Sequence, residues 1–189
     1  MTPAQLLSRL IAVGTGLALL AVGFSHSENR ETAPPSALGR PAVTALAATN
    51  AQTFEKQVLT LVNKARAKKR KCGAKTYAAA KALKWNAKLA LAAERHSKDM
   101  SVRNYFSHTS KSGKSPYARI KATGYRYRAA AETLAAGYAT PSAVVNGWLK
   151  SPGHCKIVMS KSYTQVGIGF YSGGGKYRHY TTANFAKPK

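Results

Sequence analysis

Val166-Gly167-Ile168-Gly169-Phe170 is the segment that indicates the fold of this chain most clearly. Apolar side chains alternate with glycines in it, at the period of two that is typical of a β-strand. Because glycine has no side chain, every second position leaves one face of the strand bare, which indicates that another backbone packs closely against it. Residues 172–175 contain three glycines and residues 177–185 supply a second strand, so the segment predicts a β-hairpin.

The sequence before this hairpin has the periodicity of helices. Apolar residues recur at steps of three and four through a first helix, which we expect to end near Gly73. The four predicted helix starts are Thr53, Asn86, Ser115 and Thr140, the last two each followed by a proline. Residues 131–135 are a candidate third strand. Helices that precede strands predict an α+β fold, with the helices packed on an antiparallel sheet.

The N-terminal 52 residues are predicted to lie outside the folded domain. In residues 1–24, Arg9 precedes 15 residues without a charge, the length of the apolar region of a signal peptide and short for a membrane span of about 30 Å. The alternative is an uncleaved anchor, which would bring the N-terminus into contact with the membrane. Residues 25–52 lack apolar periodicity and indicate a disordered linker or part of the leader. The domain is expected over residues 53–187, outside the cytoplasm in either case.

Cys72 and Cys155 are the two cysteines of the chain. An even number of cysteines in an exported chain favours a disulfide, and the alternative is a pair of reduced core cysteines. A bridge between them would enclose 83 residues, and it would connect the end of the first helix to the segment that carries His154.

The charge of the chain points to anionic partners. The chain has 30 Lys and Arg against 6 Asp and Glu. Three of the basic and two of the acidic residues precede residue 53, which leaves 27 against 4 and a net charge of +23. The densest basic cluster, residues 68–71, is predicted to fall in the last turns of the first helix. Since we expect the chain to be exported, an anionic envelope polymer or a lipid surface is a more plausible partner than a nucleic acid. The alternative is that the positive charge serves only general solubility.

Histidines and one acid are the candidates for chemistry. His108 and His154 lie in segments that we expect to be loops, 46 positions apart, so their spacing does not show whether they meet. His96 falls on the apolar face of the second helix, which favours a buried imidazole bonded to a backbone carbonyl. Glu132 is the last acid and lies in an apolar stretch, where a carboxylate needs a partner. It is either a structural acid bonded to N–H groups or a member of a site.

Seven stretches follow one another in an order that identifies a family. They are residues 96–100, 105–109, 124–125, 132–137, 148, 151–155 and 163–170. Together they cover about residues 54–186, and as an ordered set they are far more specific than any single motif. The chain resembles the CAP superfamily of cysteine-rich secretory, antigen-five and pathogenesis-related proteins, in particular its bacterial SCP-like branch.

This resemblance implies an α-β-α sandwich, secretion, and a groove with two histidines and two acids that binds divalent metal in relatives. His108 and His154 match the two histidines by position, Glu132 matches the first acid, and Ser151 belongs to the same groove. The second acid has no counterpart, because Lys150 and Ser151 stand where the family places it. Two more departures are Thr133 in place of an asparagine, and residues 180–183, which lack the tryptophan and glutamine of the family.

These departures favour binding over catalysis. General acid–base catalysis of the glycosidase type requires two carboxylates, and the sequence offers no second acid for Glu132. The first hypothesis is therefore a secreted, non-catalytic domain that binds an anionic or amphiphilic envelope component. Zinc or another divalent cation would be bound weakly at His108 and His154. The alternative is a metal-dependent hydrolase that uses His108, Glu132 and His154. A nucleic-acid binder, which charge alone would support, ranks last.

Overall fold

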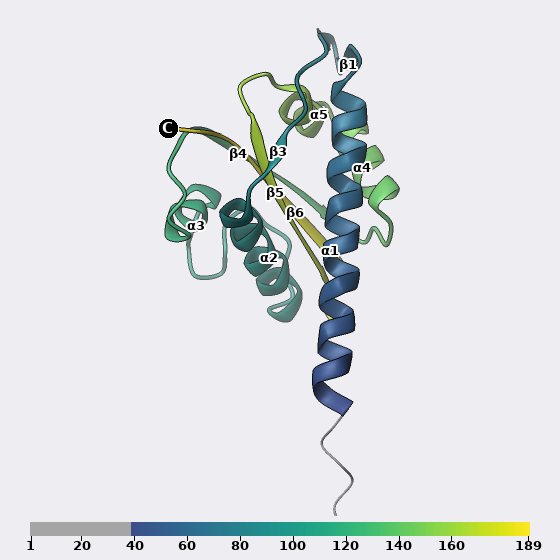
Figure 1. Ribbon diagram of the computed structural model, residues 1–189, viewed down its shortest axis with the longest axis vertical. Helices are drawn as coiled ribbons and strands as arrows, with labels where there is room; N and C mark the ends of the chain where they lie inside the picture. The colour runs from purple at the N-terminus through teal and green to yellow at the C-terminus, as the bar shows by residue number, and fades with distance from the viewer. Residues whose placement is uncertain (1–38) are drawn as a thin grey trace, which may run out of the picture. The chain divides into compact units, whose positions relative to one another are not determined.

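The computed structural model describes residues 39–189, with a four-stranded sheet at its centre (Figure 1). The strands are, in sheet order, β3 (Lys84–Trp85), β5 (Gln165–Ser172), β6 (His179–Pro188) and β4 (Tyr127–Ala136). β5 and β6 form the predicted antiparallel hairpin, with Val166 opposite Phe185, and β4 is the predicted third strand, here longer than expected. β3 pairs with β5 in the parallel direction over two residues. The antiparallel arrangement thus holds for the three long strands.

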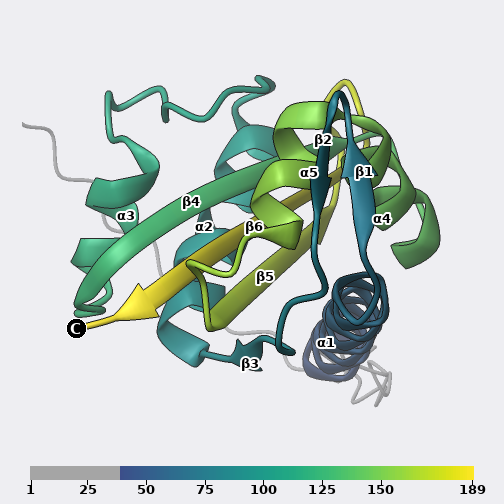
Figure 2. The ribbon, with the colours of Figure 1, turned by 90° about the horizontal axis from the view of Figure 1, so that it is seen from above.

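Helices cover both faces of this sheet (Figure 2). One face carries α2 (Ala87–Val102) and α3 (Pro116–Ala122). The other carries α1 (Gly39–Arg66), α4 (Pro141–Lys150) and α5 (Pro152–Met159). The α+β class and the α-β-α sandwich are therefore confirmed.

The glycines of β5 are required by the approach of α2. A Cβ atom at Gly167 would lie 1.9 Å from the backbone nitrogen of Ala90, and one at Gly169 would lie 2.0 Å from that of Glu94. No side chain fits at such distances, so the helix and the strand meet backbone to backbone. The close approach predicted from the alternating glycines is confirmed.

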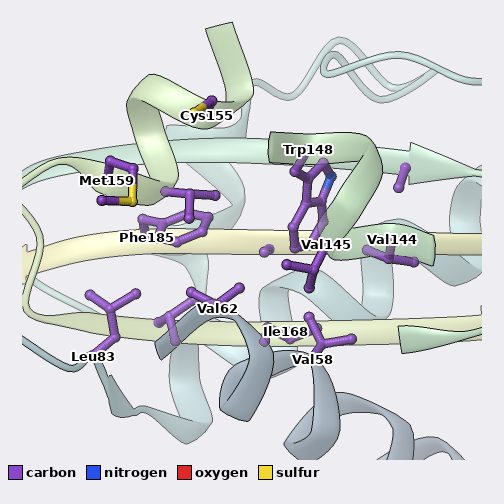
Figure 3. Packing of buried hydrophobic residues seen from close by; sticks show 14 of the residues in the cluster. Val58, Val62, Leu83, Val144, Val145, Trp148, Cys155, Met159, Ile168 and Phe185 are labelled. Carbon is purple, nitrogen blue, oxygen red and sulfur yellow. The ribbon is translucent and has the colours of Figure 1, made fainter. Parts of the chain in front are cut away.

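The main core lies between the sheet and the helices α1, α4 and α5 (Figure 3). Val58 and Val62 of α1, Trp148 of α4, Met159 of α5 and Phe185 of β6 belong to this cluster. Each of these side chains is almost fully buried. At roughly 1.5–3 kcal/mol for each large apolar side chain, this cluster anchors all three helices to one sheet face.

Three of the four helix starts are confirmed, and the start of the first helix is wrong. Asn86, Ser115 and Thr140 cap α2, α3 and α4 with their side-chain oxygens. α1 begins at Gly39, and Thr53 lies inside it with Oγ1 bonded to the carbonyl of Thr49 at 3.0 Å. Residues 39–52 are rich in alanine, the residue with the highest helix propensity, so this part is helical without an apolar stripe.

The end of α1 also differs from the prediction. The helix ends at Arg66, not near Gly73, so the basic residues 68–71 lie beyond its last turn. Arg66 is buried and donates hydrogen bonds to the carbonyls of Lys81, Val158 and Ser160 at 2.9, 2.5 and 2.9 Å. These bonds hold the end of the helix against the segments that precede β3 and β5.

Beyond α1, a small antiparallel hairpin consists of β1 (Arg70–Cys72) and β2 (Lys75–Tyr77). Cys72 forms the predicted disulfide with Cys155, and their Cα atoms are 5.5 Å apart. The bridge therefore joins this hairpin, and not the end of the helix, to α5.

The predicted leader, residues 1–24, and the first part of the predicted linker, residues 25–38, lie outside the described residues. In the region that is described, each helix is too short or too polar to span a bilayer.

Candidate functional site

The two candidate histidines line one cavity of about 640 Å³, together with Ser151. His108 comes from the segment between α2 and α3, and Ser151 and His154 come from the junction of α4 and α5. The rest of the lining is Phe106, Ser107, Leu134, Ala135, Ala136, Tyr138, Gly147, Trp148 and Tyr177. We call this cavity the groove. Segments that are far apart in the sequence thus meet at one surface.

His154 lies in the first turn of α5, so the expectation that it lies in a loop is wrong. Ser151 ends α4 and is the residue before Pro152, the first residue of α5, and its carbonyl accepts a bond from the nitrogen of Cys155 at 2.8 Å. A serine followed by a proline is the same start signal that predicted α3 correctly. The disulfide at Cys155 fixes the turn that follows His154.

Glu132 does not line the groove but lies behind His108. Its side chain is 1% exposed, and Nδ1–H of His108 donates to its Oε1 at 2.9 Å. With Nδ1 donating, the lone pair of this imidazole is on Nε2. The side chain of His108 is 51% exposed, so Glu132 sets the tautomer of a histidine that remains accessible. Glu132 is thus bonded to an N–H group, and the donor is a histidine that lines the groove.

Arg119 is the functional residue that the sequence did not reveal. Its Nη2 donates to Oε2 of Glu132 at 2.7 Å, and its Nη1 donates to the carbonyl of His108 at 2.8 Å. It therefore neutralises the buried acid and also holds the backbone of the histidine segment. The sequence indicates that the carboxylate of Glu132 requires a hydrogen-bond or charge partner, but no pattern in it identifies a residue of α3 as that partner.

His96 supports the same segment from the other side. It is buried, and Nε2–H donates to the carbonyl of Ser107 at 2.9 Å. This is the structural imidazole that the sequence predicted. Burial is the main cause that lowers the pKa of His96, followed by the charge of Arg119, so it is neutral at neutral pH.

The surroundings of His154 favour its neutral form. Burial lowers the pKa of His154, and the neighbouring His108 lowers it further. Both effects disfavour the protonated ring, so His154 keeps a lone pair available at neutral pH. Two imidazole nitrogens, one on each ring, can therefore accept a proton or bind a cation from the groove.

The donor set does not fit a catalytic zinc centre. A catalytic zinc takes three protein ligands and a water. Both oxygens of Glu132 are already bonded to His108 and Arg119. Within residues 39–189, no three His, Cys, Asp or Glu side chains are grouped so that they could hold a metal. Glu132 thus orients the ring of His108 and is itself held by Arg119.

Exposed aromatic rings are the second feature of the groove that the sequence missed. Phe106 is 45% exposed, Tyr138 41% and Tyr177 39%, and the rings of Phe106 and Tyr177 lie 5.8 Å apart. These three rings lie beside the histidines, where they give the groove an apolar wall.

The layered fold and a groove with two histidines define a CAP-type domain. The family model named CAP, the cysteine-rich secretory protein family, matches residues 59–185. The chain therefore belongs to the CAP family, and the resemblance stated from its motifs is confirmed.

Comparison with other proteins gives bacterial relatives. The chain is 31% identical over 147 residues to the uncharacterized protein YkwD of Bacillus subtilis, and 38% identical over 135 residues to the uncharacterized membrane protein YlbC of the same species. These alignments cover 78% and 71% of this chain but 54% and 35% of the relatives. The chain thus spans about half or less of the length of the curated relatives that it matches.

Two solved structures share the fold. An extracellular protein of Bacillus anthracis that contains an SCP domain is 27% identical, with a TM-score of 0.61 over 75% of this chain and 42% of that one. An outer surface protein of Borrelia burgdorferi is 19% identical, with a TM-score of 0.60 over 73% of this chain and 95% of that one. At that identity, the second similarity shows the fold alone.

Proposed function

We propose that this CAP domain is a secreted, non-catalytic binding module that holds an anionic amphiphile of the cell envelope in the groove. The observation that carries the proposal is the composition of the groove. Two imidazoles and three exposed aromatic rings line it, and its lining contains no carboxylate. A site with these properties offers one region for an apolar chain and another for a polar or negative head group.

The apolar part of the ligand would lie on the aromatic wall. Phe106, Tyr138 and Tyr177 expose ring surface beside Ala135 and Ala136. Exposed apolar surface of this extent, with polar groups at its rim, is typical of ligand-binding grooves and interaction sites.

The charged part would lie near the histidines. The one carboxylate close to them, Glu132, is neutralised by Arg119 and is 1% exposed, so it does not repel an anion. The ammonium group of Lys176 lies 5.6 Å from the ring centroid of Tyr177, at the edge of the same groove. The net charge of the domain adds long-range attraction that salt weakens.

A location outside the cytoplasm fits the covalent structure. The Cys72–Cys155 disulfide persists in oxidising compartments, and the Bacillus anthracis relative is an extracellular protein. The apolar run of residues 10–24 is the expected export signal.

Binding of lysophospholipids below their micellar concentration tests this proposal. Lysophosphatidylglycerol should bind more tightly than lysophosphatidylcholine in calorimetry, and its advantage should shrink as salt rises. The double variant Phe106→Ala/Tyr138→Ala should weaken both ligands, whereas the control Tyr117→Ala, an exposed tyrosine of α3, should weaken neither. Equal affinity for the two head groups, or binding that the double variant retains, would reject the groove as the site.

A weak cation site at His108 and His154 is part of the same proposal. Zinc titration of the wild type should show weak binding that His154→Ala abolishes. If both proteins bind zinc alike, these are not the ligands. The alternative function, a metal-dependent hydrolase, makes a different prediction. Chelator-sensitive turnover of an ester or peptide library that Glu132→Gln abolishes would replace a binding module by an enzyme.

A further inference from the structure

A second cavity, of about 500 Å³, lies where α1 meets β3 and α2. Its functional side chains are Gln52, Glu55 and Lys56 of α1, Trp85 of β3, and Leu91 and Glu94 of α2. It shares no lining residue with the groove. Its volume is within the range of roughly 300–1,000 Å³ that small-molecule sites occupy.

Glu55 is a buried carboxyl with a free oxygen at this cavity. The residue is 2% exposed, and its Oε1 accepts a bond from the nitrogen of Phe170 at 2.9 Å. In the described part of the chain, Oε2 has no hydrogen-bond partner. Oε2 keeps some accessible surface, so water or a ligand in the cavity can bond to it.

Glu94 is the second carboxyl of the cavity. The structure gives it no hydrogen bond or ion pair to any residue from 39 to 189. Burial raises the pKa of Glu55 to about 7, with a smaller contribution from the charge of Glu94, and partial burial raises the pKa of Glu94. At neutral pH the two carboxyls therefore offer a hydroxyl donor as well as acceptor oxygens.

Trp85 supplies the apolar surface of the cavity. Its side chain is 39% exposed, and Leu91, at 37%, lines the cavity with it. Trp148, the other tryptophan of the chain, is 1% exposed in the core. A solvent-exposed aromatic ring next to carboxyl and amide groups is complementary to a ligand that has one apolar face and a polar edge.

We propose that this cavity binds a neutral glycan, with a pyranose ring stacked on Trp85 and its hydroxyls bonded to Glu55, Glu94 and Gln52. A pyranose has an apolar C–H face, and its hydroxyls donate as well as accept, which matches the groups of the cavity. An anion would meet two carboxyls, and a cation would meet Lys56 in a domain that is strongly positive. A neutral polyhydroxylated ligand avoids both repulsions. This site is independent of the proposed amphiphile groove.

Tryptophan fluorescence tests the glycan site directly. Titration of the full chain with chitotetraose and with cellotetraose should give a saturable change in emission for at least one of them. Because the ligand is neutral, the affinity should not change between low and high salt, unlike that of the amphiphile. In calorimetry, Trp85→Ala should lower the affinity roughly tenfold, the value of one lost aromatic contact. Glu94→Gln should also weaken binding, and it keeps the shape of the side chain.

The control is Phe106→Ala, which removes an exposed ring from the groove and should leave glycan binding unchanged. Thermal unfolding of each variant shows whether it is folded. The proposal is overturned if neither glycan changes the emission, or if Trp85→Ala binds as tightly as the wild type. Loss of binding in Phe106→Ala would also overturn it, since the ligand would then lie in the other cavity. Failure of lysophospholipid binding leaves this site intact, so the two proposals fail separately.

Discussion

Replacing Glu55 by glutamine is expected to stabilise the protein at high pH and to have little effect near pH 4. The buried carboxyl has a pKa raised from its ordinary 4.5 to about 7, mainly by burial. Between these two values the native state keeps a proton that the unfolded chain has lost. The native state therefore binds more protons than the unfolded state, and the contribution of Glu55 to stability falls as the pH rises through this window.

The magnitude follows from the same two values. A difference between 4.5 and about 7, at about 1.4 kcal/mol per pH unit, gives a cost of about 3 kcal/mol for the ionised form above pH 8. Glutamine has no such cost, and its carbonyl oxygen can still accept the bond from the nitrogen of Phe170. The free energy of unfolding of Glu55→Gln should thus exceed that of the wild type by about 3 kcal/mol at pH 8.

Urea unfolding at pH 4, 6 and 8, with the disulfide intact, measures this difference. The gap between variant and wild type should be small at pH 4, intermediate at pH 6 and largest at pH 8. Since the charge of Glu94 contributes to the raised pKa, Glu94→Gln should move the window for Glu55 to lower pH. A gap that stays constant with pH, or that narrows as the pH rises, would refute the reasoning.

Three further predictions concern packing, covalent structure and the groove. Gly167→Ala should destabilise the protein by about 3 kcal/mol or more, because its Cβ would overlap the backbone of α2. Gly153→Ala has open space around it and should be nearly neutral. Thermal unfolding of the two variants measures the difference. Replacing both Cys72 and Cys155 by alanine should lower the free energy of unfolding in urea by about 4–5 kcal/mol, the chain-entropy value for a loop of 83 residues. A decrease below about 1 kcal/mol would contradict this prediction. NMR titration of His154 should give a pKa below 6.5, and a value above 6.5 would show that burial does not dominate there.

Much of the fold could be predicted because local rules and tertiary packing agree. The alternating glycines of residues 166–170 indicate a strand against which another backbone packs closely, and in the structure α2 packs there. The caps at Asn86 and Thr140 follow from side-chain oxygens that accept backbone N–H bonds within one turn. The start of α1 could not be predicted from apolar periodicity, because an alanine-rich helix forms without it.

The groove was predicted only through family resemblance, and its electrostatics were not. The two histidines come from segments separated by β4, and no local pattern shows that they line one cavity. The state of Glu132 depends on Arg119, which lies 13 positions away on another element. Such a pair is set by tertiary structure, so its partner cannot be derived from spacing on one helix or strand.

The few acids of this basic domain explain how its two cavities differ. Three of the four carboxyls in residues 39–189 have a protein partner: Glu132 is held by Arg119 and His108, Asp99 by Tyr105 and Arg103, and Glu55 by the backbone of β5. Glu94 has no hydrogen bond or ion pair within residues 39–189, although the charge of Arg95 acts on it, and it lines the same cavity as Glu55 and the exposed ring of Trp85. The groove, by contrast, has its one nearby carboxylate neutralised. The groove therefore suits a negative head group, and the second cavity suits a neutral ligand rich in hydroxyls. Raising the salt concentration should weaken binding in the groove and leave binding in the second cavity unchanged.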